Sequence, residues 1–162
     1  MQMSDLDKII KRYVAFEIRV GERITELCSP HCRHCKSICC KSDFCREALE
    51  SPFLSLIRER FPASAPYSEK QGWLTPKGCV LRVGRPPVCY EFFCNRIISA
   101  QPSAQDRKNL EQLGFLISRM GKNALGSRHL VEIMTSEKLH KVRFSRFEKR
   151  LRDAEEILIK LL

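Results

Sequence analysis

Cysteine is concentrated in one short stretch of this chain of 162 residues. Residues 28–40 read CSPHCRHCKSICC, so five cysteines and two histidines occupy thirteen positions. Three kinds of chemistry use such a cluster: a disulfide framework, a redox-active dithiol, and a metal site built from thiolates. The chain has nine cysteines, an odd number that cannot all pair within it, and this disfavours the disulfide framework.

A thiolate metal site explains the cluster best. Cys32 and Cys35 form a C-x₂-C pair, whose turn aims two sulfurs at one ion, and thiolates are soft ligands that bind zinc and iron strongly. The chain offers five further candidate ligands: Cys39, Cys40, Cys79, Cys89 and Cys94. We therefore predict that a metal staples two distant segments together. The sulfurs of the C-x₂-C pair, Cys79 and Cys89 should then lie within about 4 Å of one another.

Two sequence blocks resemble the YkgJ-like cysteine-cluster family, which is described as a zinc- or iron-chelating domain. That family has a CxxCxxCC segment, followed by a GC…RPxxC block with an aromatic residue and often one more cysteine after it. Here CRHCKSICC supplies the first motif and GCVLRVGRPPVCYEFFC the second, so the resemblance covers residues 32–95. The matching positions are Cys32, Cys35, Cys39 and Cys40 in the first motif, and Gly78, Cys79, Arg85, Pro86, Cys89, Phe92 and Cys94 in the second. The resemblance implies a metal-binding module.

The chain departs from the family pattern at one place. Three residues, 36–38, separate Cys35 from Cys39, where the family usually has two. This leaves open which of Cys39 and Cys40 binds the metal. The spacing fits neither of the common ferredoxin patterns, which favours zinc over iron. Seven sulfurs exceed the four that one tetrahedral ion needs, so iron, an iron–sulfur cluster or a second metal ion stays an alternative.

Residues around the candidate ligands are expected to support the site. Cys28 and Cys45 lie outside the resemblance, and we expect both to be small buried residues. His31 and His34 are expected to face the solvent. Arg85 is expected to donate hydrogen bonds to the sulfurs, and the prolines after it to fix the approach of the chain to the next cysteine.

The same C-x₂-C pair allows a second function, thiol–disulfide exchange by Cys32 and Cys35. A positive charge nearby would lower the pKa of one thiol of such a pair. A redox motif of the thioredoxin type follows a strand and opens a helix, whereas a long helix is expected before Cys32. Haem attachment is excluded, because the C-x-x-C-H motif requires histidine where this chain has Lys36.

The chain is also basic, with a formal net charge of +10. Residues 138–152 contain a single acid, Glu148, among these basic residues: Lys138, Lys141, Arg143, Arg146, Lys149, Arg150 and Arg152. Three of these residues would share one helical face: Arg143, Arg146 and Arg150. A third hypothesis is therefore a metal-stapled module that binds nucleic acid or an acidic protein through residues 138–152. No phosphate-binding loop and no HExxH motif occurs, so we assign no catalytic residue.

The spacing of apolar residues predicts a mainly α fold: one small helical domain over residues 1–162, with a short β-hairpin, organised around the cysteine-ligated site. Its expected parts are an N-terminal helix over 5–27, a cysteine-rich module over 28–98 and a helical region over 103–162. No stretch is apolar enough to span a membrane, and no secretory signal precedes the first helix. These features predict a cytoplasmic protein.

Capping residues and turns predict where the first elements begin and end. Ser4 caps the N-terminal helix, and Ser29-Pro30 is expected to end it at Leu27. Short helices are expected over 43–50 and 52–60. The sequence Thr-Pro-Lys-Gly, flanked by apolar residues, then predicts a hairpin turn.

The C-terminal region carries similar signals. Ser103 is expected to cap a helix that ends at Gly121, and Ser127 a short helix that runs through Met134. A capping box formed by Ser145 and Glu148 is expected to open the last helix. An apolar stripe of that helix is expected to pack on the body of the protein: Phe147, Leu151, Ala154, Leu158 and Leu161. The remaining two histidines are expected on the surface: His129 and His140.

Overall fold

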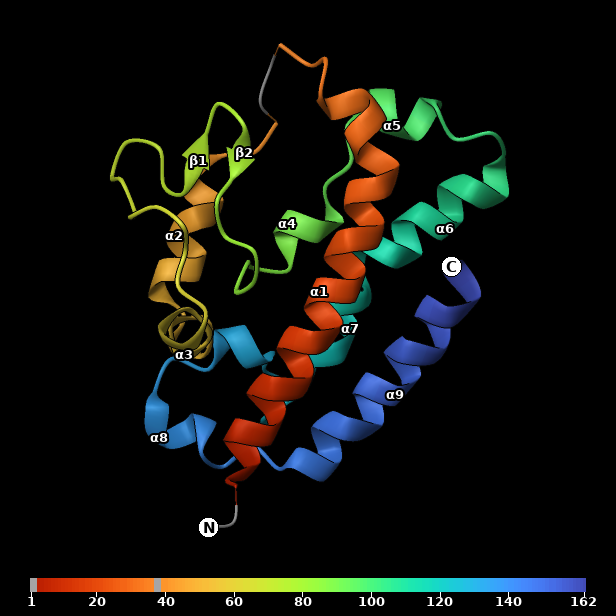
Figure 1. Ribbon diagram of the computed structural model, residues 1–162. Helices are drawn as coiled ribbons and strands as arrows, with labels where there is room; N and C mark the ends of the chain where they lie inside the picture. The colour runs from red at the N-terminus through yellow and green to blue at the C-terminus, as the bar shows by residue number, and fades with distance from the viewer. Residues whose placement is uncertain (1–2, 37–38) are drawn as a thin grey trace.

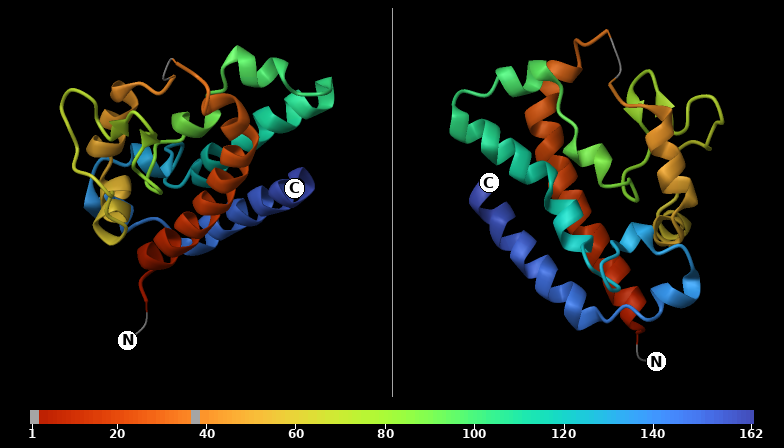
Figure 2. Two further views of the ribbon diagram at one scale, coloured as in Figure 1. Left: turned by 45° about the horizontal axis from the view of Figure 1, so that its top comes forward. Right: turned by 180° about the vertical axis from the view of Figure 1, so that it is seen from behind.

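The computed structural model describes residues 3–36 and 39–162, and its fold is mainly helical, as the sequence predicts (Figure 1). A long helix, α1 (Asp5–Cys32), runs through the middle. The last helix, α9 (Phe144–Leu161), lies on one side of α1, and the hairpin and two short helices lie on the other (Figures 1 and 2). None of the described helices has the length and apolarity needed to cross a membrane.

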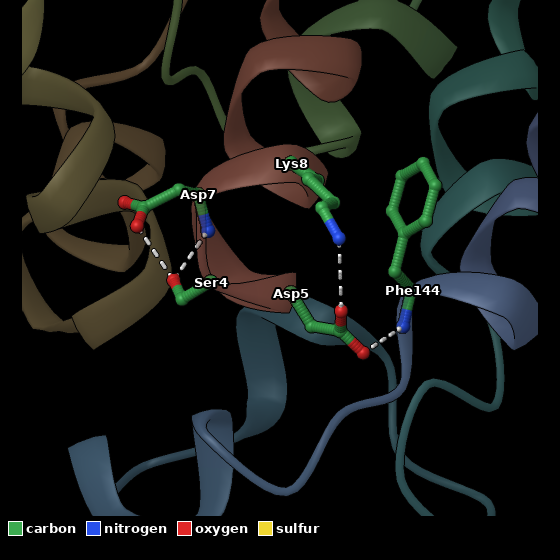
Figure 3. A network of polar contacts seen from close by, with 5 residues as sticks. All are labelled: Ser4, Asp5, Asp7, Lys8 and Phe144. Atoms are coloured by element: carbon green, nitrogen blue, oxygen red, sulfur yellow. Dashed lines mark hydrogen bonds and ion pairs between the residues drawn. The ribbon is translucent and has the colours of Figure 1, made fainter. Parts of the chain in front are cut away.

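The N-terminus of α1 is fixed by a polar network that also holds α9 (Figure 3). Ser4 caps the helix as predicted, because its hydroxyl oxygen accepts a hydrogen bond of 3.2 Å from the amide of Asp7. The carboxylate of Asp5 accepts a hydrogen bond of 3.1 Å from the amide of Phe144 and forms an ion pair with Lys8 at 3.6 Å. Phe144 is the first residue of α9, so this network joins the starts of the two helices.

The C-terminus of α1 differs from the prediction. The helix does not end at Leu27 but continues through Pro30 to Cys32. Proline removes one amide donor from the helix, and a backbone hydrogen bond of 3.2 Å from Arg33 to the carbonyl of Ser29 still closes the last turn. The expected helix end is therefore wrong, and α1 itself carries part of the cysteine cluster.

The packing of α9 confirms one expectation and corrects another. Its apolar stripe contacts α1 and α7 (Leu116–Gly121), as predicted. Leu161 is partly buried, and the other members of the stripe are fully buried: Phe147, Leu151, Ala154 and Leu158. The predicted capping box is wrong, because the helix begins at Phe144 with Arg143 at the cap, and Ser145 lies inside it.

The helix expected from Ser103 to Gly121 divides into two. Ser103 caps α6 (Ala104–Gly114) as predicted, accepting a hydrogen bond of 3.1 Å from the amide of Asp106. α6 ends at Gly114, Phe115 separates the two helices and is exposed, and α7 follows directly. This break lets apolar residues on both sides of it, including Leu113 and Leu116, reach the core.

On the other side of α1, the expected short elements are present. The two strands of the hairpin are antiparallel, with Leu74 opposite Cys79 and Thr75 opposite Gly78. The core is shared across the molecule, and the rings of Tyr13 on α1 and Phe53 pack edge to face with centroids 5.0 Å apart. The elements here are α2 (Ser42–Glu50), α3 (Pro52–Arg60), β1 (Leu74–Thr75), β2 (Gly78–Cys79) and α4 (Val88–Glu91). The next helix, α5 (Asn95–Ser99), lies beside the C-terminal end of α1, on the side of α6 (Figure 1).

The segment between α7 and α9 also differs from the prediction. No helix runs from Ser127 to Met134, a stretch that is fully described; a 3₁₀ turn, η1 (Leu130–Glu132), and a short helix, α8 (Ser136–Leu139), follow one another instead. His129, rather than Ser127, caps the turn.

The position of His129 corrects a further expectation. His140 is exposed as predicted, but His129 is buried. Its Nδ1 accepts a hydrogen bond of 3.2 Å from the amide of Val131, and its own amide donates to the carboxylate of Glu132 at 2.8 Å. The ring of His129 is buried at the start of the turn, where its Nδ1 accepts the hydrogen bond of a backbone amide that has no backbone partner there.

Gly121, the last residue of α7, gives a stability prediction. A Cβ at this position would lie 2.2 Å from Cε1 and Nε2 of the buried His129 ring. We expect Gly121→Ala to lower the free energy of unfolding by about 2 kcal/mol, because overpacking displaces the ring. Gly21→Ala is the matched control: its Cβ would meet only Tyr90, at an ordinary 3.8 Å, and helix propensity should then raise the free energy of unfolding by about 0.5–1 kcal/mol. Urea unfolding of both variants checks this, and equal losses would contradict it.

His129 also predicts how stability depends on pH. Burial lowers the pKa of the ring below its ordinary value of 6.5, against the opposing effects of the carbonyls of Ile117 and Ser118 and the charge of Glu132. The unfolded chain therefore binds the proton more readily, so the contribution of His129 is present above about pH 6.5 and is lost as the pH falls. Between pH 7 and 5, the loss of unfolding free energy should be smaller in His129→Gln than in the control His140→Gln. Parallel curves for the two variants would contradict this assignment.

Candidate metal centre

The candidate ligands come from the end of α1 and the connection that follows it, from the hairpin, from α4 and from the start of α5. Of these segments, α5 lies beside the C-terminal end of α1, and α4 lies farther back along the same helix (Figure 1). Ser37 and Ile38, two of the three residues that separate Cys35 from Cys39, lie outside the described residues. Cys32 ends α1, Cys35, Cys39 and Cys40 lie between α1 and α2, Cys79 ends β2, Cys89 lies in α4, and Cys94 caps α5.

One group of thiols gathers where α5 contacts α1. Burial raises the pKa of both the Cys32 and the Cys39 thiols, and the charges of Cys94 and Cys35 add to this effect. Burial, together with the charges of Cys32 and Cys94, also raises the pKa of the Cys28 thiol to about 11. The first motif, Cys28 and the last cysteine of the second motif therefore share one neighbourhood.

A second group lies around the side chain of Arg85. Burial raises the pKa of the Cys79 thiol and raises that of Cys89 to about 12, although Cys89 as a whole residue has substantial exposed surface. The Arg85 guanidinium lowers the pKa of both thiols, which places a cation beside them. Its Nε donates a hydrogen bond of 2.6 Å to the carbonyl of Leu81, rather than to a sulfur as expected.

Cys40 connects the two groups. Its charge raises the pKa of the Cys32 and Cys39 thiols in the first group, and that of Cys79 and Cys89 in the second. The thiols of the two sequence motifs are therefore close enough to influence one another across the gap of about forty residues that separates them in the chain.

The sulfurs do not close on a single point. Within residues 3–36 and 39–162, no three side chains of histidine, cysteine, aspartate or glutamate are arranged to hold a metal ion. The expected approach of the sulfurs of Cys32, Cys35, Cys79 and Cys89 to about 4 Å is therefore not found in this arrangement. Among the described residues, the cysteines of the two motifs are therefore neighbours that do not form a ligand shell.

Cys45 and Cys28 were expected to be buried. Cys45 is buried, and it packs so closely on Gly72 that a Cβ on that glycine would lie 2.5 Å from its sulfur. Cys28 is only half-buried and lies one helical turn before Cys32, on the same face of α1. The expectation for Cys28 is therefore wrong: it belongs with the first group of thiols.

Glu17 on α1 organises the segment that carries Cys89, and sequence reasoning missed it. The residue is 1% exposed. Its carboxylate accepts hydrogen bonds from the amides of Gly84 and Arg85, at 3.0 and 3.1 Å, and from the hydroxyl of Tyr90 at 2.6 Å. Burial raises the pKa of Glu17, and these three donors act in the opposite direction. The backbone on both sides of the two prolines is thus fixed to α1.

The donor set fits a soft divalent metal. Burial raises the pKa of the Cys28 thiol to about 11 and that of the Cys89 thiol to about 12, and a metal ion would replace the protons of such thiols with a charge that several thiolates can share. The histidines add little to the set: His34 is exposed and His31 partly so, in keeping with the expected solvent-facing positions.

The surroundings of Cys32 and Cys35 differ from those of a thioredoxin-type motif. Cys32 is the last residue of α1 and no strand precedes it among the described residues, and the next helix, α2, begins only at Ser42. A backbone hydrogen bond of 3.1 Å from the amide of Cys35 to the carbonyl of Cys32 forms the turn between them.

The basic segment 138–152 presents its charges to the solvent. Ion pairs occupy Lys141, with Glu137 at 3.2 Å, and Arg152, with Glu148 at 3.8 Å. Arg143 and Arg146 are exposed, whereas Arg150 is partly covered. This is the arrangement of a solvated face beside a buried stripe.

Comparison of the chain with protein-family models, with curated proteins and with solved structures gives no match. The resemblance to the YkgJ-like family therefore depends on the residues quoted above.

Proposed function

We propose that this protein binds a metal ion, zinc in the first instance, through thiolates of its two cysteine motifs. The observation that supports the proposal is that Cys40 lies close enough to Cys32 and Cys39 in the first group, and to Cys79 and Cys89 in the second, to raise the pKa of their thiols. Of the seven motif cysteines, Cys79 and Cys94 are half-buried and the others have exposed surface, so a metal ion could reach them.

The proposed ligands are drawn from the two groups: Cys32, Cys35, Cys39, Cys40, Cys79, Cys89 and Cys94. When bound, zinc would supply the positive charge that allows several thiolates to remain deprotonated together. Arg85 would add a cation beside Cys79 and Cys89, and Glu17 would hold that segment in place. The metal would thereby join the connection after α1 to the hairpin and α4.

Three alternatives remain beside this proposal. Iron or an iron–sulfur cluster would use the same thiolates, and it is favoured by the excess of sulfurs over the four that one zinc ion needs. Exposed Arg143 and Arg146 support nucleic-acid or acidic-protein binding through residues 138–152, in addition to a metal. Thiol–disulfide exchange by Cys32 and Cys35 has less support, because a helix precedes the pair.

Elemental analysis, with an absorption spectrum, of protein purified without oxygen tests the proposal. We expect at least about one zinc ion per chain and no visible absorption. Iron in the elemental analysis, together with visible charge-transfer bands, would instead support the iron alternative. A folded protein without any metal, able to reduce a disulfide through Cys32, would instead support thiol–disulfide exchange.

A further inference from the structure

A cavity of about 430 Å³ opens beside the hairpin, and its charges are all of one sign. Cations line it from three positions: Lys77 in the hairpin turn, and Arg82 and Arg85 in the segment after β2. No carboxylate belongs to the described residues that line this cavity. Cys79 also lines it, so the cavity adjoins the second group of thiols.

Among the described residues, the three cations form no ion pair, although the charge of the buried Glu17 acts on Arg85. The nearest buried acid, Glu17, accepts hydrogen bonds from the backbone amide of Arg85 and not from its guanidinium. Three positive side chains around an open cavity without acids create a local field that attracts an anion.

Two features prepare this cavity for a small ligand. The Nε of Arg85 is held by the carbonyl of Leu81 and its amide by Glu17, so the guanidinium is oriented before any ligand arrives. The wall at Gly78 is open: a Cβ there would meet nothing within 4 Å, and its φ of +110° is one that residues with side chains rarely adopt. A ligand can therefore approach the backbone of the turn.

A second cavity shares Arg82 and Arg85 but differs in charge. It has a volume of about 340 Å³ and is also lined by Glu22 and Glu26 of α1. These carboxylates would repel an anion, so an anion should bind in the cavity beside the hairpin rather than in this one.

We propose that the cavity lined by Lys77, Arg82 and Arg85 binds a small oxyanion, a phosphate or a carboxylate, directly beside Cys79. Arg82 and Lys77 are exposed and attract the anion by their charge, and the oriented guanidinium of Arg85 donates hydrogen bonds to it. The inference goes beyond metal binding and does not depend on it. If a metal is held by Cys79, the anion would occupy the space next to it.

A titration followed by NMR tests the proposal. The purified protein, with its metal content measured, is titrated with inorganic phosphate and separately with acetate, at constant ionic strength. We expect saturable shifts of the amide signals over residues 77–85, tighter for phosphate because of its greater charge. Arg82→Gln should weaken binding about tenfold, since hydrogen bonds between charged groups have about this strength. Arg107→Gln is the control for net charge: it removes an exposed arginine of α6 outside the cavity, and should change affinity less than twofold.

Three results would overturn the proposal: shifts that do not saturate, equal weakening by the two variants, or loss of metal from Arg82→Gln with no phosphate binding to the unaltered protein. The last would mean that the cations serve only to balance thiolates. Phosphate binding to a protein without metal would contradict the proposed metal function and leave the anion site intact. Metal binding without phosphate binding would contradict the proposed anion site and leave the proposed metal function intact.

Discussion

Replacing Cys89 by serine is expected to lower metal affinity by at least about a hundredfold. A neutral hydroxyl is a poor substitute for a thiolate on a soft ion, and even residues that only support a ligand change affinity ten- to a hundredfold. At saturating metal, a hundredfold loss removes about 2.7 kcal/mol from the free energy of unfolding. The measurement is metal content after dialysis against a competing chelator, together with urea unfolding.

Cys45→Ala is the matched control. Cys45 is buried in the core against Gly72 and lies outside both motifs, so its truncation should cost about 1 kcal/mol by lost packing, without loss of metal. Hydrogen exchange adds a spatial readout. Cys89→Ser should loosen residues 28–98 in the same pattern as chelator, while α9 changes less, because it packs on α1 and α7. Equal metal content in the two variants would exclude Cys89 as a ligand.

Glu17→Gln is expected to have the second large effect. The carboxylate satisfies three donors, the amides of Gly84 and Arg85 and the hydroxyl of Tyr90, whereas the amide of glutamine offers one oxygen and turns an NH₂ group towards a donor. A buried donor without an acceptor costs about 1–3 kcal/mol, so we expect a loss of about 2 kcal/mol in the free energy of unfolding. Urea unfolding gives this value directly.

The same variant should weaken metal binding about tenfold, because the segment that carries Cys89 loses its attachment to α1. Glu22→Gln is the control: it is an exposed carboxylate on the same helix, and its replacement should change stability by less than about 0.5 kcal/mol. If Glu17→Gln lost stability but kept full metal affinity, Glu17 would be a core residue without influence on the site.

The sequence predicts the elements well where a local signal decides them. Ser4 and Ser103 cap helices as expected, because a serine at the cap satisfies an amide within its own turn. The hairpin follows from its Pro and Gly, and the stripe of α9 from its spacing. These features depend on residues that are near one another in the chain.

Prediction from the sequence fails where a local signal, such as a proline or a capping residue, does not have its usual effect. Pro30 is predicted to stop α1, but the helix continues to Cys32, and a backbone hydrogen bond from Arg33 to Ser29 still closes its last turn although the proline removes one donor. That error hid Cys28, whose spacing of four from Cys32 becomes informative only when both lie on one helix. His129 was missed for a similar reason, because its ring serves as a cap, which serine or threonine normally provides.

Glu17 could have been found from the sequence. It falls within the apolar stripe of α1, between Tyr13 and Val20, and both of these are buried. An acid on the buried face of a helix needs hydrogen-bond donors from elsewhere in the fold. The sequence alone does not say which donors, because they come from residues 84–90, which are distant in the chain.

X-ray absorption spectroscopy at the metal edge tests the central claim most directly, because it reports the atoms bound to the ion. For protein purified without oxygen, we predict a shell made mainly of sulfur, at about 2.3 Å if the metal is zinc. The sulfur number should fall in Cys89→Ser and stay unchanged in Cys45→Ala. A shell of only oxygen and nitrogen, or a folded protein that retains no metal, would contradict the claim that the clustered cysteines form a metal site.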